Sequence, residues 1–145
     1  MDISPNEKFI VSFNGTINDA PNTENYIIWN LRTAEKIRSF KAERLEVWGA
    51  FQWSYDSNFL ARLNQISSTS EELQLSVYKM PLCDMIQDAQ GKKNSIKVPG
   101  LQKFAWVENS TSLCCVSFGG NKAQNPTKVT LMEVATKIFY LKMEY

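Results

Sequence analysis

The side chains available for chemistry are limited first by an absence, because the 145 residues include no histidine. Ser-His-Asp and Cys-His catalysis are therefore excluded within this chain, and the commonest metal ligand is missing. The adjacent acidic residues Glu71 and Glu72 follow a run of serine and threonine that is typical of an exposed loop. Gly119 and Gly120 lack the spacing of a phosphate-binding loop. We expect no catalytic residue, no cofactor, no metal site and no small-molecule substrate.

The cysteines are expected to be reduced and to serve as packing residues. Their number is odd, and none stands in a CxxC spacing: they are Cys83, Cys114 and Cys115. This pattern argues against both a disulfide framework and a zinc site. We interpret them as small apolar residues, buried or half-buried.

A basic stretch is the best candidate for binding. No acidic residue falls between Asp88 and Glu108, and the lysines in or beside this interval are Lys92, Lys93, Lys97 and Lys103. Lysines in a loop can contact nucleic-acid phosphates, although solvated surface lysines are more common. A second, weaker basic cluster comprises Arg32, Lys36 and Arg38. The net charge of +1 gives the whole chain no strong field toward nucleic acid or an anionic membrane.

Aromatic and apolar residues allow two interpretations each. The four tryptophans could stack on RNA bases, but core packing is favoured; they are Trp29, Trp48, Trp53 and Trp106. The segment 81–88 could form a short helical turn or an insertion loop. Its apolar residues could dock a protein, but local burial is favoured; they are Leu82, Met85 and Ile86.

The elements that position these residues repeat along the chain. Segments 3–12, 53–62 and 106–116 each read as a turn followed by a short apolar strand, so the period is about 50 residues. A second strand follows in each repeat, at 25–30, 73–78 and 128–134. Polar loops separate the strands at 14–24, 66–72 and 119–127.

A repeat of this length with several short strands is typical of a propeller blade. The predicted fold is all-β: a β-propeller fragment of about three four-stranded antiparallel blades, with repeats at 3–52, 53–105 and 106–145. Three blades are too few to close a ring, and the first repeat begins without a strand before Ile3. We therefore expect residues 1–145 to be a partial WD-type propeller from a longer protein, cut inside a blade at both ends.

The order of motifs resembles a known family. The segments 3–11, 27–40, 48–56, 75–81, 93–106 and 125–133 are together similar to the propeller of the b subunit of the eukaryotic translation initiation factor three complex. The segments 95–106 and 126–133 are the most specific. A longer loop at 88–91, the Cys114-Cys115 pair and the tail after Lys137 depart from the family pattern.

The resemblance implies a non-catalytic scaffold. Such a protein would bind other subunits of the factor and the small ribosomal subunit during pre-initiation complex assembly and mRNA recruitment. Lys92, Lys93, Lys97 and Lys103 would then face ribosomal RNA or a partner protein. The N-terminus has no apolar stretch typical of a signal peptide, and no apolar run approaches the length of a membrane helix, so a cytoplasmic location without membrane contact is expected.

Two alternatives remain open at this stage. The chain could belong to another propeller interaction protein, such as an initiation factor two-A-like protein. It could also be the gating propeller of a hydrolase whose nucleophile lies elsewhere.

Overall fold

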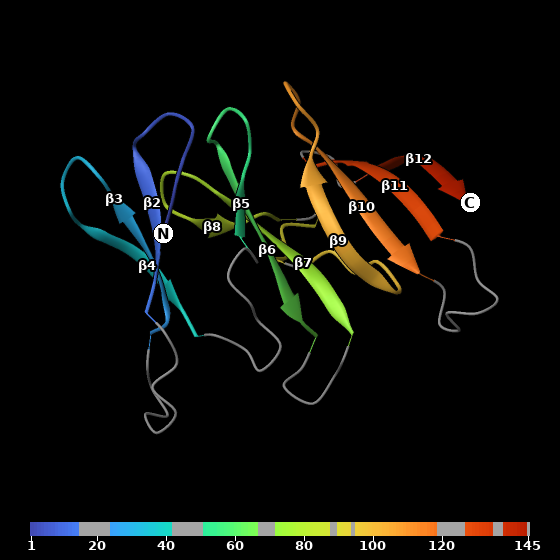
Figure 1. Cartoon of the computed structure of the whole chain (residues 1–145), viewed down its shortest axis with the longest axis horizontal. Coiled ribbons are helices and arrows are strands. Elements are labelled where there is room, and N and C mark those ends of the chain that lie inside the picture. The colour runs from blue at the N-terminus through green and yellow to red at the C-terminus, as the bar shows by residue number, and fades with distance from the viewer. Residues whose placement is uncertain are drawn as a thin grey trace.

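The computed structural model describes residues 1–14, 24–41, 51–66, 72–87, 90–93, 95–118 and 127–134 in full, and the backbone of 138–144. These residues form three four-stranded antiparallel sheets, which lie side by side in chain order (Figure 1). Within each sheet, strands adjacent in the sequence are also neighbours in space. The predicted propeller fragment of three four-stranded blades is confirmed, and each sheet is one blade.

The first blade comprises β1 (Asp2–Ile3), β2 (Phe9–Phe13), β3 (Tyr26–Asn30) and β4 (Lys36–Phe40). A strand therefore precedes the first turn, where the sequence pattern indicated none. It was missed because a two-residue strand carries no alternating pattern.

The second blade comprises β5 (Phe51–Trp53), β6 (Phe59–Gln65), β7 (Leu73–Lys79) and β8 (Asp84–Met85). The segment 81–88 was interpreted as either a helical turn or an insertion loop. Its described residues 81–87 form a turn and the edge strand β8, with no helix. The peptide bond between Met80 and Pro81 is cis, and Cys83 has a φ of 54°.

The third blade comprises β9 (Leu101–Trp106), β10 (Ser112–Phe118), β11 (Thr127–Glu133) and β12 (Ile138–Glu144). Trp53 and Trp106 are the last residues of β5 and β9. The repeats drawn from the sequence at 53 and 106 therefore begin at the end of a first strand, and each sheet starts a few residues earlier.

Burial differs between the middle blade and the two end blades. In β6 and β7 consecutive residues are buried, such as Leu60-Ala61-Arg62 and 75–78, so both faces of the second blade are covered. In β2, β3, β10 and β11 buried and half-buried residues alternate along most of each strand. Because successive side chains point to opposite faces, each end blade is fully covered on one face.

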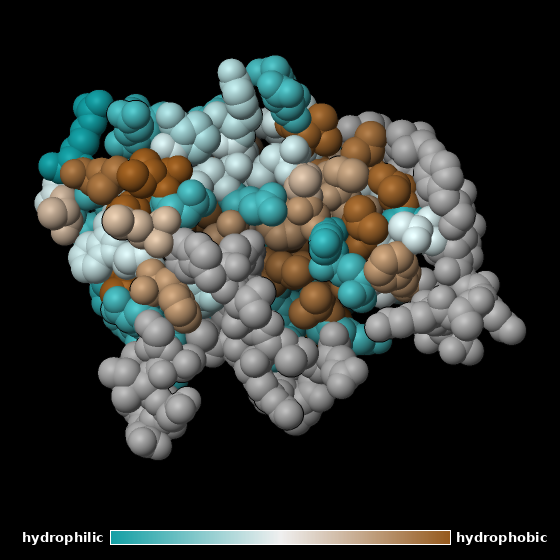
Figure 2. Space-filling view, in the orientation of Figure 1, coloured by the Kyte–Doolittle hydropathy of each residue, from teal (hydrophilic) through white to brown (hydrophobic). Residues whose placement is uncertain are grey.

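Two hydrophobic clusters fill the spaces between blades. One contains Val11, Tyr26 and Ile28 of the first blade with Leu60 of the second. The other joins the second and third blades and contains Val77, Leu113 and Met132. In the space-filling view, apolar residues show in two places, one at the upper left and one right of centre (Figure 2).

Candidate partner-binding surface

The β1–β2 and β5–β6 turns share one side-chain hydrogen-bond pattern, which fixes their shape. In the first blade, the Phe9 N–H donates to Ser4 Oγ at 3.0 Å, and Ser4 Oγ donates to Asn6 Oδ1 at 2.8 Å. In the second blade, Ser54 and Asp56 repeat both bonds, with the Phe59 N–H as donor. The Ser-x-Asn and Ser-x-Asp spacings thus give the same locked turn in both blades, as expected for side chains that bond their own backbone.

The hydrogen bonds of its turn favour the charged form of Asp56. Burial opposes its charge, but hydrogen bonds from Ser54 Oγ and from the Asn58 backbone and side chain outweigh this effect and hold the pKa of Asp56 below its usual value. The β9–β10 turn of the third blade keeps the backbone bonds of the other two turns but has different side-chain bonds. There Asn109 has a φ of 56°, and the Ser112 N–H donates to Ser110 Oγ at 3.0 Å.

The turns of all three blades gather on one surface, which we call the turn face. It comprises the β1–β2, β3–β4, β5–β6, β7–β8 and β9–β10 turns, and most of these lie along the upper edge of Figure 1. The Asn6 N–H donates to Ser57 Oγ at 3.0 Å and so joins the turns of the first two blades. Three of the exposed large hydrophobic residues belong to this face: Leu31, Tyr55 and Leu82.

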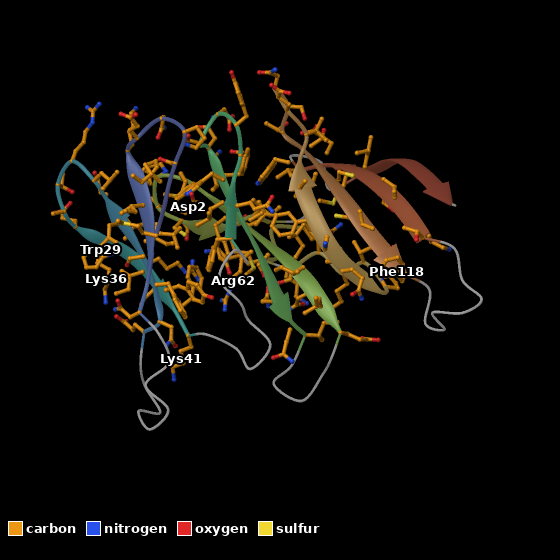
Figure 3. All side chains as sticks on the ribbon, in the orientation of Figure 1. Asp2, Trp29, Lys36, Lys41, Arg62 and Phe118 are labelled. Carbon is orange, nitrogen blue, oxygen red and sulfur yellow. The ribbon has the colours of Figure 1, made fainter. Side chains whose placement is uncertain are left out.

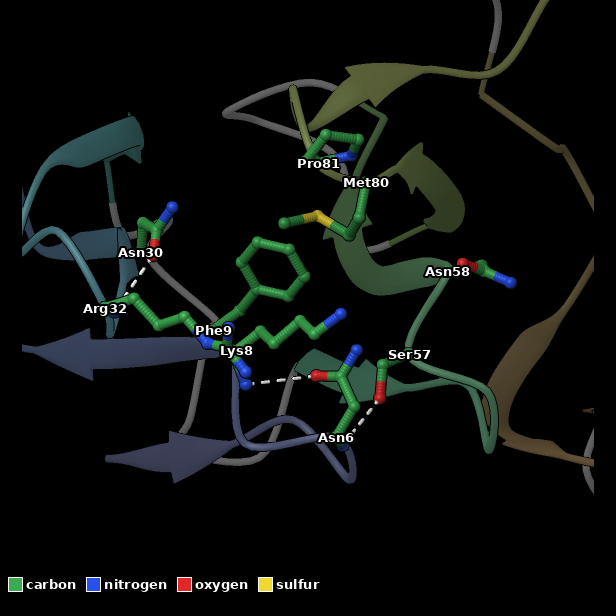
Figure 4. Close-up of a pocket in the computed structure, with 9 residues that line it drawn as sticks. All are labelled: Asn6, Lys8, Phe9, Asn30, Arg32, Ser57, Asn58, Met80 and Pro81. Carbon is green, nitrogen blue, oxygen red and sulfur yellow. Dashed lines mark hydrogen bonds between the residues drawn. The ribbon is translucent and has the colours of Figure 1, made fainter.

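Two adjoining cavities form a groove in the turn face between the first two blades. The first has a volume of about 370 Å³ and is lined by Asn6, Lys8, Phe9, Asn30, Arg32, Ser57, Asn58, Met80 and Pro81 (Figure 4). The second, of about 570 Å³, shares Asn30 and Pro81 with it and adds Glu35, Lys36, Ile37 and Leu82. We call the two together the inter-blade groove.

The lysines of the predicted basic stretch are all exposed, but one of them is paired with an acidic residue. The side chains of all four lysines are exposed: Lys92, Lys93, Lys97 and Lys103. Lys93 Nζ lies 3.3 Å from Asp84 Oδ1, across the sheet edge, so part of its charge is balanced. Within the described part of the chain, Lys97 and Lys103 have no such partner. Asp84 lies outside the interval 88–108, so the sequence did not indicate this pair. The bridge between Gln87 and Lys93 brings the two side chains together.

The second basic cluster is divided by the fold. Lys36 Nζ pairs with Glu24 Oε2 at 2.8 Å, and the pKa of Glu24 is lowered by its hydrogen bonds from Lys36 and Ser39. Arg38 packs against aromatic rings and donates to the Cys83 carbonyl. Arg32 lines the inter-blade groove.

Two arginines enclose an aromatic side chain between the first and second blades. The guanidinium carbon of Arg38 lies 5.1 Å from the centre of the Phe40 ring, and that of Arg62 lies 5.0 Å from it. Arg38 donates to the Cys83 carbonyl at 2.7 Å. The buried Arg62, labelled with Lys41 in Figure 3, donates to the Lys41 carbonyl at 2.8 Å. Arg62 ends the predicted strand segment 53–62, and nothing in its local sequence indicated that it would be buried.

The three tryptophans that the structure describes pack against, or hydrogen-bond to, other residues of the blades. Trp53 stacks on Phe9, and Trp106 stacks on Phe59, each with ring centres 6.1 Å apart, so the same contact joins consecutive blades. Trp106 Nε1 also donates to the Gln52 carbonyl at 3.0 Å. Trp29 lies on the side of the first blade away from the second and donates to Ser12 Oγ (Figure 3). Trp48 lies outside the described residues.

The cysteines also have structural roles. Cys83 and Cys115 are buried and Cys114 is half-buried, with all three thiols free, as predicted. Burial raises the pKa of Cys83 to about 12 and that of Cys115 to about 11. Among the described residues, no group of three or more His, Cys, Asp or Glu side chains is placed so that it could hold a metal ion.

The apolar residues of 81–88 do not act together. Met85 and Ile86 are half-buried against different clusters, as favoured for local burial. Leu82 instead has 72% of its surface exposed. Glu72 is exposed, while Glu71 and most of the polar loops at 14–24, 66–72 and 119–127 lie outside the described residues.

The chain is similar in sequence to the b subunit of eukaryotic translation initiation factor 3 from several organisms. It is 29% identical to the Dictyostelium discoideum protein over 140 residues and 31% identical to the Drosophila melanogaster protein over 137 residues. Each match covers 94% of this chain, but 19% and 17% of the respective relatives. The resemblance found in the sequence motifs is confirmed, and the chain spans less than one fifth of these relatives.

The fold also matches a solved structure. A crystal structure described as that of the eukaryotic initiation factor superimposes with a TM-score of 0.67 at 18% identity, covering 99% of this chain and 33% of that chain. No protein-family model matches the sequence. Among the described residues, no helix has the length and apolar character needed to cross a membrane.

Proposed function

We propose that the chain is part of the propeller of a b subunit of eukaryotic translation initiation factor 3 and acts there as a non-catalytic scaffold in the cytoplasm. It would bind other subunits of the factor and the small ribosomal subunit during pre-initiation complex assembly and mRNA recruitment. The observation that carries this proposal is similarity to the b subunit over 94% of the chain, together with the three-blade fold.

The chain would be a partial propeller, completed by further blades on both sides. One-sided burial of the end blades supports this. The half-buried face of the first blade carries Ile10, Ile27 and Trp29, and that of the third carries Val116 and Leu131. These apolar faces are equivalent to the ones that neighbouring blades cover in the second blade, so a further blade would cover them.

The scaffold would work by presenting rigid surfaces. Its basic stretch would contact ribosomal RNA phosphates or a partner protein through Lys92, Lys93, Lys97 and Lys103. Exposure of all four side chains supports this role. Because Lys93 is paired with Asp84, Lys97 and Lys103 would carry the larger share.

Sedimentation of the tagged protein from crosslinked lysate tests the scaffold function. We expect it to migrate with small ribosomal subunits and other subunits of the initiation factor. Migration as a free protein or in an unrelated complex would show the assignment to translation to be wrong, while leaving the fold assignment intact.

Charge reversal tests the basic stretch separately. Replacing all four lysines by Glu should weaken salt-dependent association with small ribosomal subunits, and Lys97→Glu with Lys103→Glu should account for most of the loss. Each phosphate contact removed should lower the slope of log affinity against log salt by roughly one. The matched control is Lys41→Glu with Lys128→Glu. An unchanged salt dependence in the fourfold variant would reject the site.

A further inference from the structure

The inter-blade groove contains positive charge that the described fold does not balance. Lys8 and Arg32 line its first cavity, and neither side chain has an ion pair or hydrogen bond within the described part of the chain. No acidic residue lines this cavity, and the one acidic residue that lines the second, Glu35, accepts a hydrogen bond from Thr33 Oγ1 at 2.9 Å. Lys36, which lines the second cavity, contrasts with them because Glu24 pairs with it.

The same groove also offers apolar contacts. Met80 and Pro81 line the first cavity, and Ile37 and Leu82 line the second. Leu82 is 72% exposed and Leu31, next to Arg32 in the β3–β4 turn, is 41% exposed. An occupant would therefore meet cations and apolar side chains in adjoining positions.

The groove walls are held in place before any partner arrives. Ser4 and Asn6 lock the turn that carries Lys8, and the Arg32 N–H donates to Asn30 Oδ1 at 2.9 Å. The Asn6–Ser57 bond fixes the two blades at this point, and Figure 4 shows Lys8 and Arg32 on the side of the first blade, opposite Asn58 and Met80 of the second. A preformed site loses less conformational entropy on binding.

The cations and apolar side chains of the groove favour a protein segment over RNA as its occupant. Single-stranded RNA is bound by cationic grooves with exposed aromatic platforms, but the aromatic ring lining this groove, Phe9, is buried. Carboxylates satisfy isolated cations, and an aliphatic side chain fits beside the exposed Pro81 and Leu82. We propose that the inter-blade groove binds a short, extended acidic segment of a partner protein, with an apolar residue between its carboxylates. This goes beyond the scaffold function and does not require the basic stretch.

Fluorescence polarisation on the full chain tests the proposal. The probe is a labelled nine-residue peptide with four glutamates and two leucines. The comparison probes are the same peptide with each glutamate replaced by glutamine, and a ten-nucleotide oligouridylate. Lys8→Ala with Arg32→Ala removes the cations, and Lys41→Ala with Lys128→Ala removes equal charge outside the groove.

We expect the acidic peptide to bind, and the Lys8/Arg32 variant to bind it roughly tenfold more weakly, since each exposed ion pair contributes a fraction of a kcal/mol. The Lys41/Lys128 variant should bind as the unchanged chain does. Leu82→Ser, at an exposed position that folding does not require, should weaken binding of the peptide as well.

Three results would overturn the proposal. They are equal binding of the glutamine peptide, tighter binding of oligouridylate that depends on Lys8 and Arg32, and no binding of the acidic peptide at millimolar concentration. Sedimentation with small ribosomal subunits does not depend on any of these outcomes, so failure of the groove and failure of the scaffold function are distinguishable.

Discussion

At the residue scale, two tryptophans occupy equivalent positions but have different hydrogen bonding. Both end the first strand of a blade and stack on a phenylalanine of the blade before. Trp106 Nε1 donates to the Gln52 carbonyl, whereas the buried Trp53 Nε1 has no hydrogen-bond partner among the described residues. A buried donor without a partner costs free energy that a satisfied one does not.

Replacement of each tryptophan by phenylalanine should separate these effects. Trp106→Phe loses packing and a hydrogen bond, whereas Trp53→Phe loses packing and removes an unpaired donor. The free energy of unfolding should therefore fall more for Trp106→Phe, by about 1 kcal/mol. Urea unfolding of both variants measures the difference, and an equal or larger loss for Trp53→Phe would contradict it.

The two buried thiols predict a decline of stability in alkali. Burial raises the pKa of Cys83 to about 12 and that of Cys115 to about 11, from an ordinary value of 9.0. Above about pH 9 the unfolded chain releases thiol protons that the folded chain still retains. The contribution of the two buried thiols to the free energy of unfolding is therefore fully present below about pH 9 and is lost as the pH rises toward 12.

The urea midpoint under reducing conditions should accordingly fall between about pH 9 and about pH 11. The Cys83→Ala, Cys115→Ala double variant is the control, and its decline should be shallower because Tyr78, whose pKa burial also raises, still contributes. Parallel curves for the two proteins would show that the thiols do not cause the decline.

At the element scale, the entry into β9 depends on one glycine. Gly100 has a φ of 71°, and an added Cβ would lie 1.8 Å from the Phe118 carbonyl oxygen. The Phe118 N–H donates to the Gly100 carbonyl at 2.9 Å, so the backbones of the two segments cannot separate without losing this bond. The third blade therefore requires glycine here for both conformation and space.

Gly100→Ala should lower the free energy of unfolding by roughly 3–5 kcal/mol. Gly91→Ala is the matched control, because Gly91 also has a positive φ but its added Cβ would meet only the end of the Gln87 side chain, at 3.9 Å. That change should cost about 1 kcal/mol. Thermal unfolding of the two variants tests the prediction, which a similar loss in both would refute.

At the scale of the whole molecule, the two end blades should govern association. Ile27 and Leu131 are half-buried on the outward faces of the first and third blades, whereas Leu75 is fully buried in the second. Exposed apolar faces of this kind mark interaction surfaces or promote aggregation.

The isolated chain should therefore self-associate at micromolar concentrations in sedimentation velocity experiments. Ile27→Lys with Leu131→Lys should reduce association while the circular dichroism of the sheets is kept. Leu75→Lys should instead unfold the chain. A chain that stays monomeric at about 100 μM would show that these faces need no covering blade.

The sequence alone determined the repeated units, because turn formers and apolar alternation are local signals. Ser4 and Asn6, and Ser54 and Asp56, mark their turns wherever those turns lie in space. The three blades followed from such patterns. The free thiols followed from an odd cysteine count without CxxC spacing, and the packing of Trp53 from the preference of aromatic side chains for the core. The two-residue strand β1 and the edge strand β8 did not, since they exist only by pairing with β2 and β7.

Only the tertiary structure decided which polar residues are available to a partner. Asp84 reaches Lys93 across a local bend of the chain, whereas Arg38 reaches the Cys83 carbonyl and Arg62 is buried against aromatic rings through contacts between distant segments. Lys8 and Arg32 line one groove because β2 and β3 are paired. Electrostatic partners depend on distance in space, and sequence spacing does not encode that distance once strands from different blades pack together.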